Sequence, residues 1–139
     1  MHRAIPFLAA AACTYLLSWF LPVIQIVPGL DKVGWQAFQF ALSAIWDHRN
    51  LSAFDVVLYA SCALTNVVIV LSFVSLVARL RVPTPVIVGA LVVAATLNLW
   101  WFIFAGNERR DLRIGYYLWV FSFACLAVGA QLYPRYMTD

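Results

Sequence analysis

Charge is scarce in this chain of 139 residues, of which only 11% are Asp, Glu, Lys or Arg. A bilayer core is crossed by about 20 mostly apolar residues in helical form. Four stretches without formal charge are long enough for this, and a hydrophobic share of 65% is more than a soluble domain of this length would bury. We therefore expect an integral membrane protein. The uncharged stretches are 4–30, 56–78, 82–107 and 114–134.

Breaks between these stretches indicate the architecture. Pro22 ends the first apolar helix, and Pro83 and Pro85 interrupt the chain between the second and the third. Short connections make neighbouring helices antiparallel. We predict an all-α fold, an integral membrane four-helix bundle that forms a single transmembrane domain over residues 1–139. The spans are expected at about 4–21, 54–78, 84–105 and 114–133.

Groups that carry chemistry are equally scarce. The apolar stretches hold no carboxylate for proton-coupled transport, and His2 and His48 fall outside them, where they would not ligate a haem. Cys13, Cys62 and Cys125 occur singly, without the spacing of a redox or zinc pair. No basic tract indicates a nucleic-acid partner. We expect no enzyme activity and no catalytic residue, metal or cofactor.

The first loop, about 23–52, is the sizeable segment outside the predicted spans. Apolar residues recur in it at helical spacing, and Asp31 precedes them as a possible N-cap. We predict a short amphipathic helix over about 32–47, which lies flat on the membrane or caps the mouth of the bundle. The weak alternation of 23–27 is compatible with an extended segment. The apolar face of the predicted helix consists of Trp35, Phe38, Leu42, Ile45 and Trp46.

All six tryptophans map to the side of the membrane on which this loop lies. Interfacial anchoring is the simplest interpretation of such a layer. The alternative is a surface that binds a partner or a lipid. Trp19 ends the first predicted span, and Trp119 begins the fourth. The candidate binding residues of the aromatic layer are Trp35, Phe38, Trp46, Trp100 and Trp101.

Two asparagines lie inside the predicted spans. Asn66 is at the middle of the second span and Asn98 just beyond the middle of the third, so in antiparallel helices their depths differ by only about 4 to 5 Å. We expect the two side chains to meet or to share a water. Such interhelical hydrogen bonds mostly stabilise packing, by about 0.6 to 2 kcal/mol, and the alternative is contact with a ligand or ion.

Basic residues gather in the turn before the fourth span. Arg109, Arg110 and Arg113 stand there beside Glu108 and Asp111. The three arginines are candidates for binding an anionic lipid headgroup or an acidic partner. A solvated turn with internal ion pairs is the alternative interpretation.

Positive charge also bears on orientation, although the two sides nearly tie under the positive-inside rule. Arg3 lies directly beside the first span, whereas Lys32 is distant from it and adjoins Asp31. We therefore predict that both termini are cytoplasmic and the first loop is periplasmic. The cytoplasmic set would be Arg3, Arg79, Arg81 and Arg135, and the periplasmic set Lys32, Arg49, Arg109, Arg110 and Arg113.

Three short segments carry a resemblance to known proteins. Residues 18–22 read SWFLP, residues 34–38 read GWQAF and residues 115–119 read GYYLW. In these segments the chain resembles small four-span inner-membrane proteins of bacteria. The resemblance implies a bacterial inner-membrane location. It is not specific to one activity, and it carries over no functional residue.

Together these features predict a non-enzymatic membrane interaction protein. It would be an accessory subunit, an assembly factor or an immunity-type protein that meets a membrane or periplasmic protein through the first loop and the aromatic layer. The lipid bilayer is its other expected partner. The alternative is a binder of lipid or of a hydrophobic small molecule, or a small oligomeric channel. Its cavity would be roofed by the loop helix and lined near Asn66 and Asn98.

Overall fold

The computed structural model describes residues 3–27, 29–47, 51–104 and 110–133. This part of the chain is mostly helical (77%) and holds five helices, so the all-α expectation is confirmed. Each of the four long helices begins and ends within one residue of a predicted span. They are α1 (Ile5–Phe20), α3 (Ala53–Val77), α4 (Thr84–Phe104) and α5 (Ile114–Leu132). Features noted above at His2, His48, Arg49, Glu108, Arg109 and Arg135 lie outside the described residues.

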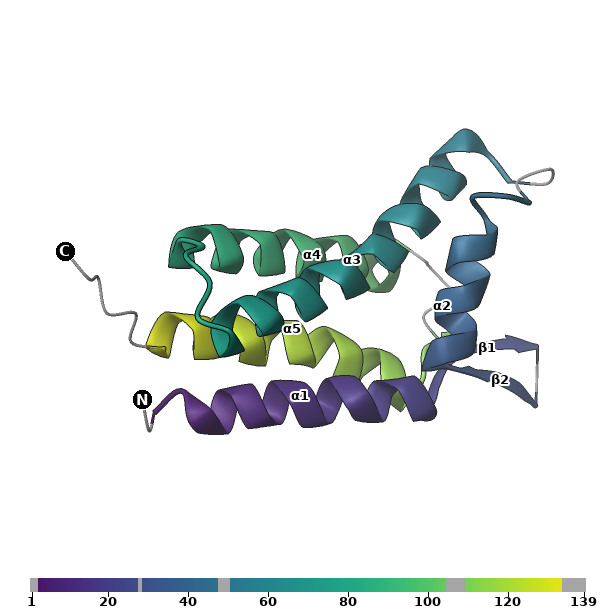
Figure 1. The fold of residues 1–139 in the computed structure, drawn as a ribbon. Helices are drawn as coiled ribbons and strands as arrows, with labels where there is room; N and C mark the ends of the chain where they lie inside the picture. The colour runs from purple at the N-terminus through teal and green to yellow at the C-terminus, as the bar shows by residue number, and fades with distance from the viewer. Residues whose placement is uncertain (1–2, 28, 48–50, 105–109, 134–139) are drawn as a thin grey trace.

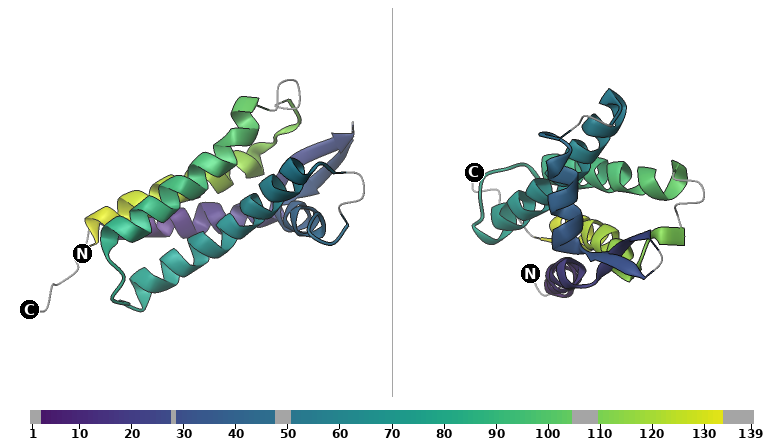
Figure 2. Two further views of the ribbon diagram at one scale, coloured as in Figure 1. Left: turned by 90° about the horizontal axis from the view of Figure 1, so that it is seen from above. Right: turned by 90° about the vertical axis from the view of Figure 1, so that its right-hand side faces the viewer.

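The long helices pack into one bundle, in which α1 lies beside α5 and the α3–α4 hairpin covers them (Figure 1). Leu91, Phe123 and Leu126 are almost completely buried in its core. Toward its N-terminal end α3 diverges from the other long helices, and α2 (Gly34–Ser43) lies there between α3 and α1 (Figures 1 and 2). The bundle is therefore widest at the end that carries the first loop.

The N-terminal end of α3 is fixed by a capping box. Ser52 Oγ accepts the backbone N–H of Asp55 at 3.1 Å, and the Asp55 carboxylate accepts the N–H of Ser52 at 3.3 Å. A carboxylate in the first turn also complements the positive end of the helix dipole. The diverging end of α3 is thus a regular helix beginning.

The first loop begins with a β-hairpin. β1 (Pro22–Val27) pairs with the antiparallel β2 (Leu30–Val33), in agreement with an extended segment over 23–27. Gly29 in the turn has φ +85°, a conformation that favours glycine. The hairpin leads directly into α2.

The predicted loop helix over 32–47 is wrong at both ends. Lys32 belongs to β2, where it pairs with Ile24, so the helix begins only at Gly34. It ends at Ser43 after 10 residues, and Trp46 lies in the turn that follows. Strand pairing satisfies the backbone groups that the helix would otherwise have used.

Asp31 is not the N-cap of α2. It lies in β2, and its carboxylate is 3.5 Å from Nε of Arg113, near the start of α5. Val33 occupies the N-cap position, and its N–H donates to the side-chain oxygen of Gln36 at 3.3 Å. Gln36 in the first turn therefore accepts the N–H of the N-cap residue, and Val33 supplies no side-chain acceptor for the N–H groups of the first turn.

Two helices in the described part of the chain, α3 and α5, are long and apolar enough to cross a membrane by length and composition. α1 and the Thr84–Trp100 part of α4 are shorter apolar helices. Large apolar side chains also cover the outside of the bundle, where Phe20 is 75% exposed, Leu71 59% and Val93 61%. Such surfaces are rare in soluble monomers, which suggests that the protein associates with a membrane.

Candidate ligand-binding cavity

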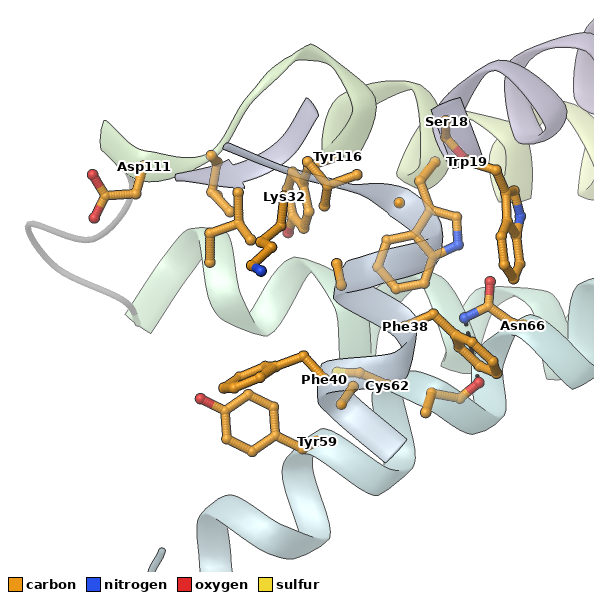
Figure 3. Close-up of a pocket in the computed structure, with 18 of the residues that line it drawn as sticks. Ser18, Trp19, Lys32, Phe38, Phe40, Tyr59, Cys62, Asn66, Asp111 and Tyr116 are labelled. Carbon is orange, nitrogen blue, oxygen red and sulfur yellow. Dashed lines mark hydrogen bonds between the residues drawn. The ribbon is translucent and has the colours of Figure 1, made fainter. Parts of the chain in front are cut away.

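A cavity of about 390 Å³ lies at the wide end of the bundle, between α1, α2, α3, the hairpin and the start of α5 (Figure 3). Small-molecule sites usually measure about 300 to 1,000 Å³ and have mostly apolar walls with a few polar groups. The lining of this cavity has that composition. Its aromatic residues are Trp19, Phe38, Phe40, Tyr59, Tyr116 and Trp119.

A close backbone contact at Gly34 holds the first turn of α2 against the end of α1. A Cβ atom on this residue would lie 2.2 Å from the carbonyl oxygen of Ser18 and 2.8 Å from the Cα of Trp19. One turn later, Phe38 packs against the ring of Trp19, with centroids 5.4 Å apart. Both rings line the cavity, so the glycine contact positions one of its walls.

Arg113, in the segment before α5, forms hydrogen bonds and an ion pair with the hairpin. Its backbone N–H donates to the carbonyl of Val23 at 2.9 Å. Its guanidinium donates to the side-chain oxygen of Gln25 and, at 2.8 Å, to the carbonyl of Arg110, and it also faces Asp31. Arg113, a predicted headgroup ligand, is therefore engaged within the chain. Arg110 is exposed and does not line the cavity.

The inner end of the cavity is bordered by Asn66, whose side chain is almost fully buried. The Nδ2 of Asn66 donates to the carbonyl of Ala63 at 3.3 Å (Figure 3). The hydroxyl of Tyr15 donates to the Oδ1 of Asn66 at 3.2 Å. The bond from Tyr15 joins α1 to α3 at the depth where the cavity ends, whereas the bond to Ala63 lies within α3. Asn66 is thus a polar border held in place by protein partners.

Asn98 lies outside the cavity lining, fully buried on α4. Its Nδ2 donates to Oγ1 of Thr65 at 3.1 Å, so it bonds to the neighbour of Asn66 and not to Asn66 itself. The hydroxyl of Tyr116 donates to the main-chain carbonyl of Asn98 at 2.5 Å. These two bonds join α3 and α5 to α4 at this depth.

The outer end of the cavity carries charge. Lys32, the single lysine of the chain, reaches from β2 into the space between Tyr116 and Phe40 (Figure 3). Phe40 and Tyr59 meet edge to face beside this space, with centroids 5.9 Å apart. Asp111 also lines this end, but its carboxylate is turned away from Lys32 (Figure 3). The outer end therefore presents one inward-facing ammonium group within aromatic walls.

Trp119 holds a buried donor that lacks an acceptor among the described residues, its indole Nε1. The ring packs edge to face against Tyr116 and Phe123, with centroids 6.4 and 6.1 Å away. An unpaired buried donor costs about 1 to 3 kcal/mol. The nitrogen is covered by protein, so Trp119 contributes apolar wall and not a polar contact.

The structure places some of the predicted site residues in the cavity lining and others outside it. Phe38 and Asn66 come together in the cavity lining, whereas Asn98 lies behind it. Trp35 (43% exposed) and Trp46 (74% exposed) lie on the surface outside the cavity. The expected aromatic face is thus divided between a cavity wall and an exposed surface.

The remaining aromatic candidates lie away from the cavity or outside the description. Trp100 packs near Phe54, with ring centroids 6.4 Å apart, and the side chain of Trp101 is outside the described part of the chain. Sequence reasoning missed Lys32 and Tyr116 as site residues. The available signal for Lys32 was that it is the single lysine of the chain.

The three segments that carry the bacterial resemblance meet around the cavity. A Cβ atom on Gly115 would lie 2.7 Å from the carbonyl oxygen of Pro22, which parallels the close contact at Gly34. Residues 18–22 and 34–38 therefore pack backbone to backbone, and residues 115–119 pack likewise on 18–22. Each of the three segments contributes side chains to the lining.

Known proteins offer no template for this site. No protein-family model, curated protein or solved structure matches the chain. Within the described residues, no group of three or more His, Cys, Asp or Glu side chains is placed to hold a metal ion. The cavity is therefore interpreted from its own shape and chemistry.

Proposed function

We propose that this chain is a four-span membrane protein that binds a lipid or another hydrophobic small molecule in the cavity beneath its first loop. The observation that carries the proposal is the cavity of about 390 Å³, with six aromatic residues in its lining and Asn66 at its inner end. Burial of a ligand against such walls contributes about 25 cal/mol per Å² of apolar area. A few polar groups are then enough to orient it.

The apolar outer faces of α1, α3, α4 and α5 support four spans. α3 has 25 residues and α4 has 21, within the range of about 17 to 25 for spanning helices. α1 has 16, and a bilayer adapts to a short span by local thinning. We place the protein in a bacterial inner membrane with cytoplasmic termini, which puts α2 and the outer end of the cavity at the periplasmic interface.

Photolabelling of the purified full-length protein in detergent tests the cavity function. The probe is a neutral long-chain alcohol with a diazirine near the end of its chain, and labelled residues are located by peptide mass spectrometry. We expect saturable labelling near Trp19 and Asn66, because the cavity buries the chain. Excess alcohol without the diazirine should compete with the probe.

A matched pair of tryptophan substitutions makes this test specific. Ala41→Trp adds a ring to the cavity lining and should reduce labelling about fivefold or more, because the ligand loses apolar burial. Ala124→Trp places the same ring on the exposed face of α5 and should leave labelling unchanged. Circular dichroism and thermal unfolding confirm that both variants fold. Labelling that does not saturate, or that the two variants reduce equally, would overturn the proposal.

The exposed aromatic residues of the loop favour a second candidate function. The side chains of Trp35 and Trp46 are exposed, so they could bind a membrane or periplasmic protein. An accessory subunit, an assembly factor or an immunity-type protein would use such a surface. Co-purification from mild detergent separates the two functions. A bound protein that is lost when both tryptophans become alanine, with photolabelling unchanged, would favour the interaction function.

A further inference from the structure

We infer that the cavity selects a single-chain amphiphile with an anionic head group, and that Lys32 binds the head. This inference rests on the proposed function, because it specifies the ligand of the same cavity. It follows from the charge at the outer end, from the direction in which the polarity of the lining changes, and from the volume.

The ammonium group of Lys32 forms no ion pair with a carboxylate of the described residues. Among the residues that the structure describes in this region, an ion pair joins Arg113 to Asp31. Neighbouring residues of a strand point to opposite faces, so Asp31 faces Arg113 while Lys32 faces the cavity. The carboxylate of Asp111 is turned away (Figure 3). An ammonium group that lines the cavity and has no carboxylate partner among the described residues favours an anionic ligand group, which would form a charge-assisted hydrogen bond.

The polarity of the lining changes along the cavity in the way that an amphiphile requires. Lys32 lies at the outer end, and the apolar residues Trp19, Phe38 and Ala63 line the walls inward of it. Asn66 also borders the inner end, but its amide groups are bonded to Tyr15 and to the carbonyl of Ala63. With the first loop at the membrane interface, the head group would lie level with the lipid headgroups. The chain would then point toward the bilayer midplane. An amphiphile would enter in the orientation that it already has in the periplasmic leaflet.

The volume of about 390 Å³ favours one chain over two. It lies near the lower limit of small-molecule sites, about 300 to 1,000 Å³, which favours a slender ligand with a single chain. A fatty acid and a single-chain phosphate ester share the required chemistry, one apolar chain and one anionic head. The experiment distinguishes these two sources.

Photoprobes with one diazirine chain and different head groups test the inference in the full-length protein. The heads are a carboxylate, a phosphate monoester, a neutral alcohol and a quaternary ammonium. We expect an anionic probe to half-saturate the cavity at about tenfold lower concentration than the alcohol, because a hydrogen bond to a charged group is added. The anionic probe that half-saturates the cavity at the lower concentration identifies the head group. The ammonium probe should bind most weakly.

Substitution of Lys32 separates recognition of the head from burial of the chain. Lys32→Gln should remove the tenfold advantage of the anionic probe and leave half-saturation by the alcohol unchanged, whereas Lys32→Arg should keep the advantage. Arg81→Gln removes the same charge from an exposed position at the opposite end of the bundle and should change neither. As a second readout, the bound anionic probe should protect Lys32 from acetylation by an amine-reactive ester.

Each contrary outcome has one meaning. Equal half-saturation by anionic and neutral probes, or tighter binding of the ammonium probe, overturns the inference and leaves the hydrophobic cavity intact. An anionic advantage that persists in Lys32→Gln also overturns it. If the neutral alcohol itself fails to saturate the cavity, the proposed function is overturned.

Discussion

Single polar residues inside the bundle bond from helix to helix. Tyr15 reaches Asn66, Asn98 reaches Thr65, and Tyr116 reaches the main chain of Asn98. In an apolar surrounding these bonds satisfy groups that have no water to bond to. They lie at and below the inner end of the cavity. They therefore fix the relative positions of the helices that form its walls.

Asn98→Ala should lower the free energy of unfolding by about 1 to 2 kcal/mol, because a buried interhelical hydrogen bond and its packing are lost. Thr96→Ala is the matched control on the same helix. The Thr96 hydroxyl is exposed and donates to the carbonyl of Val92 in its own helix at 2.9 Å, so its loss should cost less than about 0.5 kcal/mol. Reversible unfolding in detergent measures both values. Equal losses would show that the bond of Asn98 adds nothing to stability.

At the scale of elements, the long helices follow from the sequence and the first loop does not. Apolar length and the prolines at 22, 83 and 85 locate α1, α3, α4 and α5 to within a residue at each end. The apolar residues at helical spacing begin only at Trp35, and periodicity alone cannot show that Lys32 and Val33 pair with β1. The cavity depends on that pairing and on backbone contacts at Gly34 and Gly115. Such contacts join residues distant in sequence and leave no local pattern.

The backbone contact between α1 and α2 yields a prediction at this scale. Gly34→Ala should lower stability by about 1 to 3 kcal/mol and reduce photolabelling of the cavity, because the new Cβ would force α2 away from Ser18. Gly89→Ala is the control, since nothing lies within 4 Å of its Cβ position. At this position in the interior of α4, alanine should raise stability by about 0.5 to 1 kcal/mol. Thermal unfolding of both variants checks the opposite signs, and loss of stability in both would contradict the contact argument.

At the scale of the whole molecule, the two ends of the bundle differ in character. One end carries the hairpin, α2 and the outer end of the cavity, and the other carries the tight connection between α3 and α4 (Figure 1). The proposed ligand is an amphiphile of one leaflet. Its source therefore depends on the compartment that the loop end faces. Helix packing is the same in either orientation, so orientation is argued from charge alone.

Cysteine accessibility in spheroplasts tests the predicted orientation. In a background with Cys13, Cys62 and Cys125 replaced by alanine, Ser43→Cys at the exposed end of α2 should be labelled by a membrane-impermeant thiol reagent in intact spheroplasts. Thr84→Cys at the start of α4 should be labelled only after lysis. The physical reason is that basic residues flanking a span resist translocation.

The reverse labelling pattern would overturn the predicted orientation and change the meaning of the site. The outer end of the cavity would then open at the cytoplasmic leaflet, and the anionic amphiphile would come from the cytoplasm. The exposed Arg110 would face the anionic lipids of that leaflet, a contact worth about 1 kcal/mol for each basic residue near the surface. A periplasmic partner for Trp35 and Trp46 would be excluded in that orientation. Binding of the anionic probe by Lys32 would remain as argued, because it depends on the geometry of the cavity and not on the compartment.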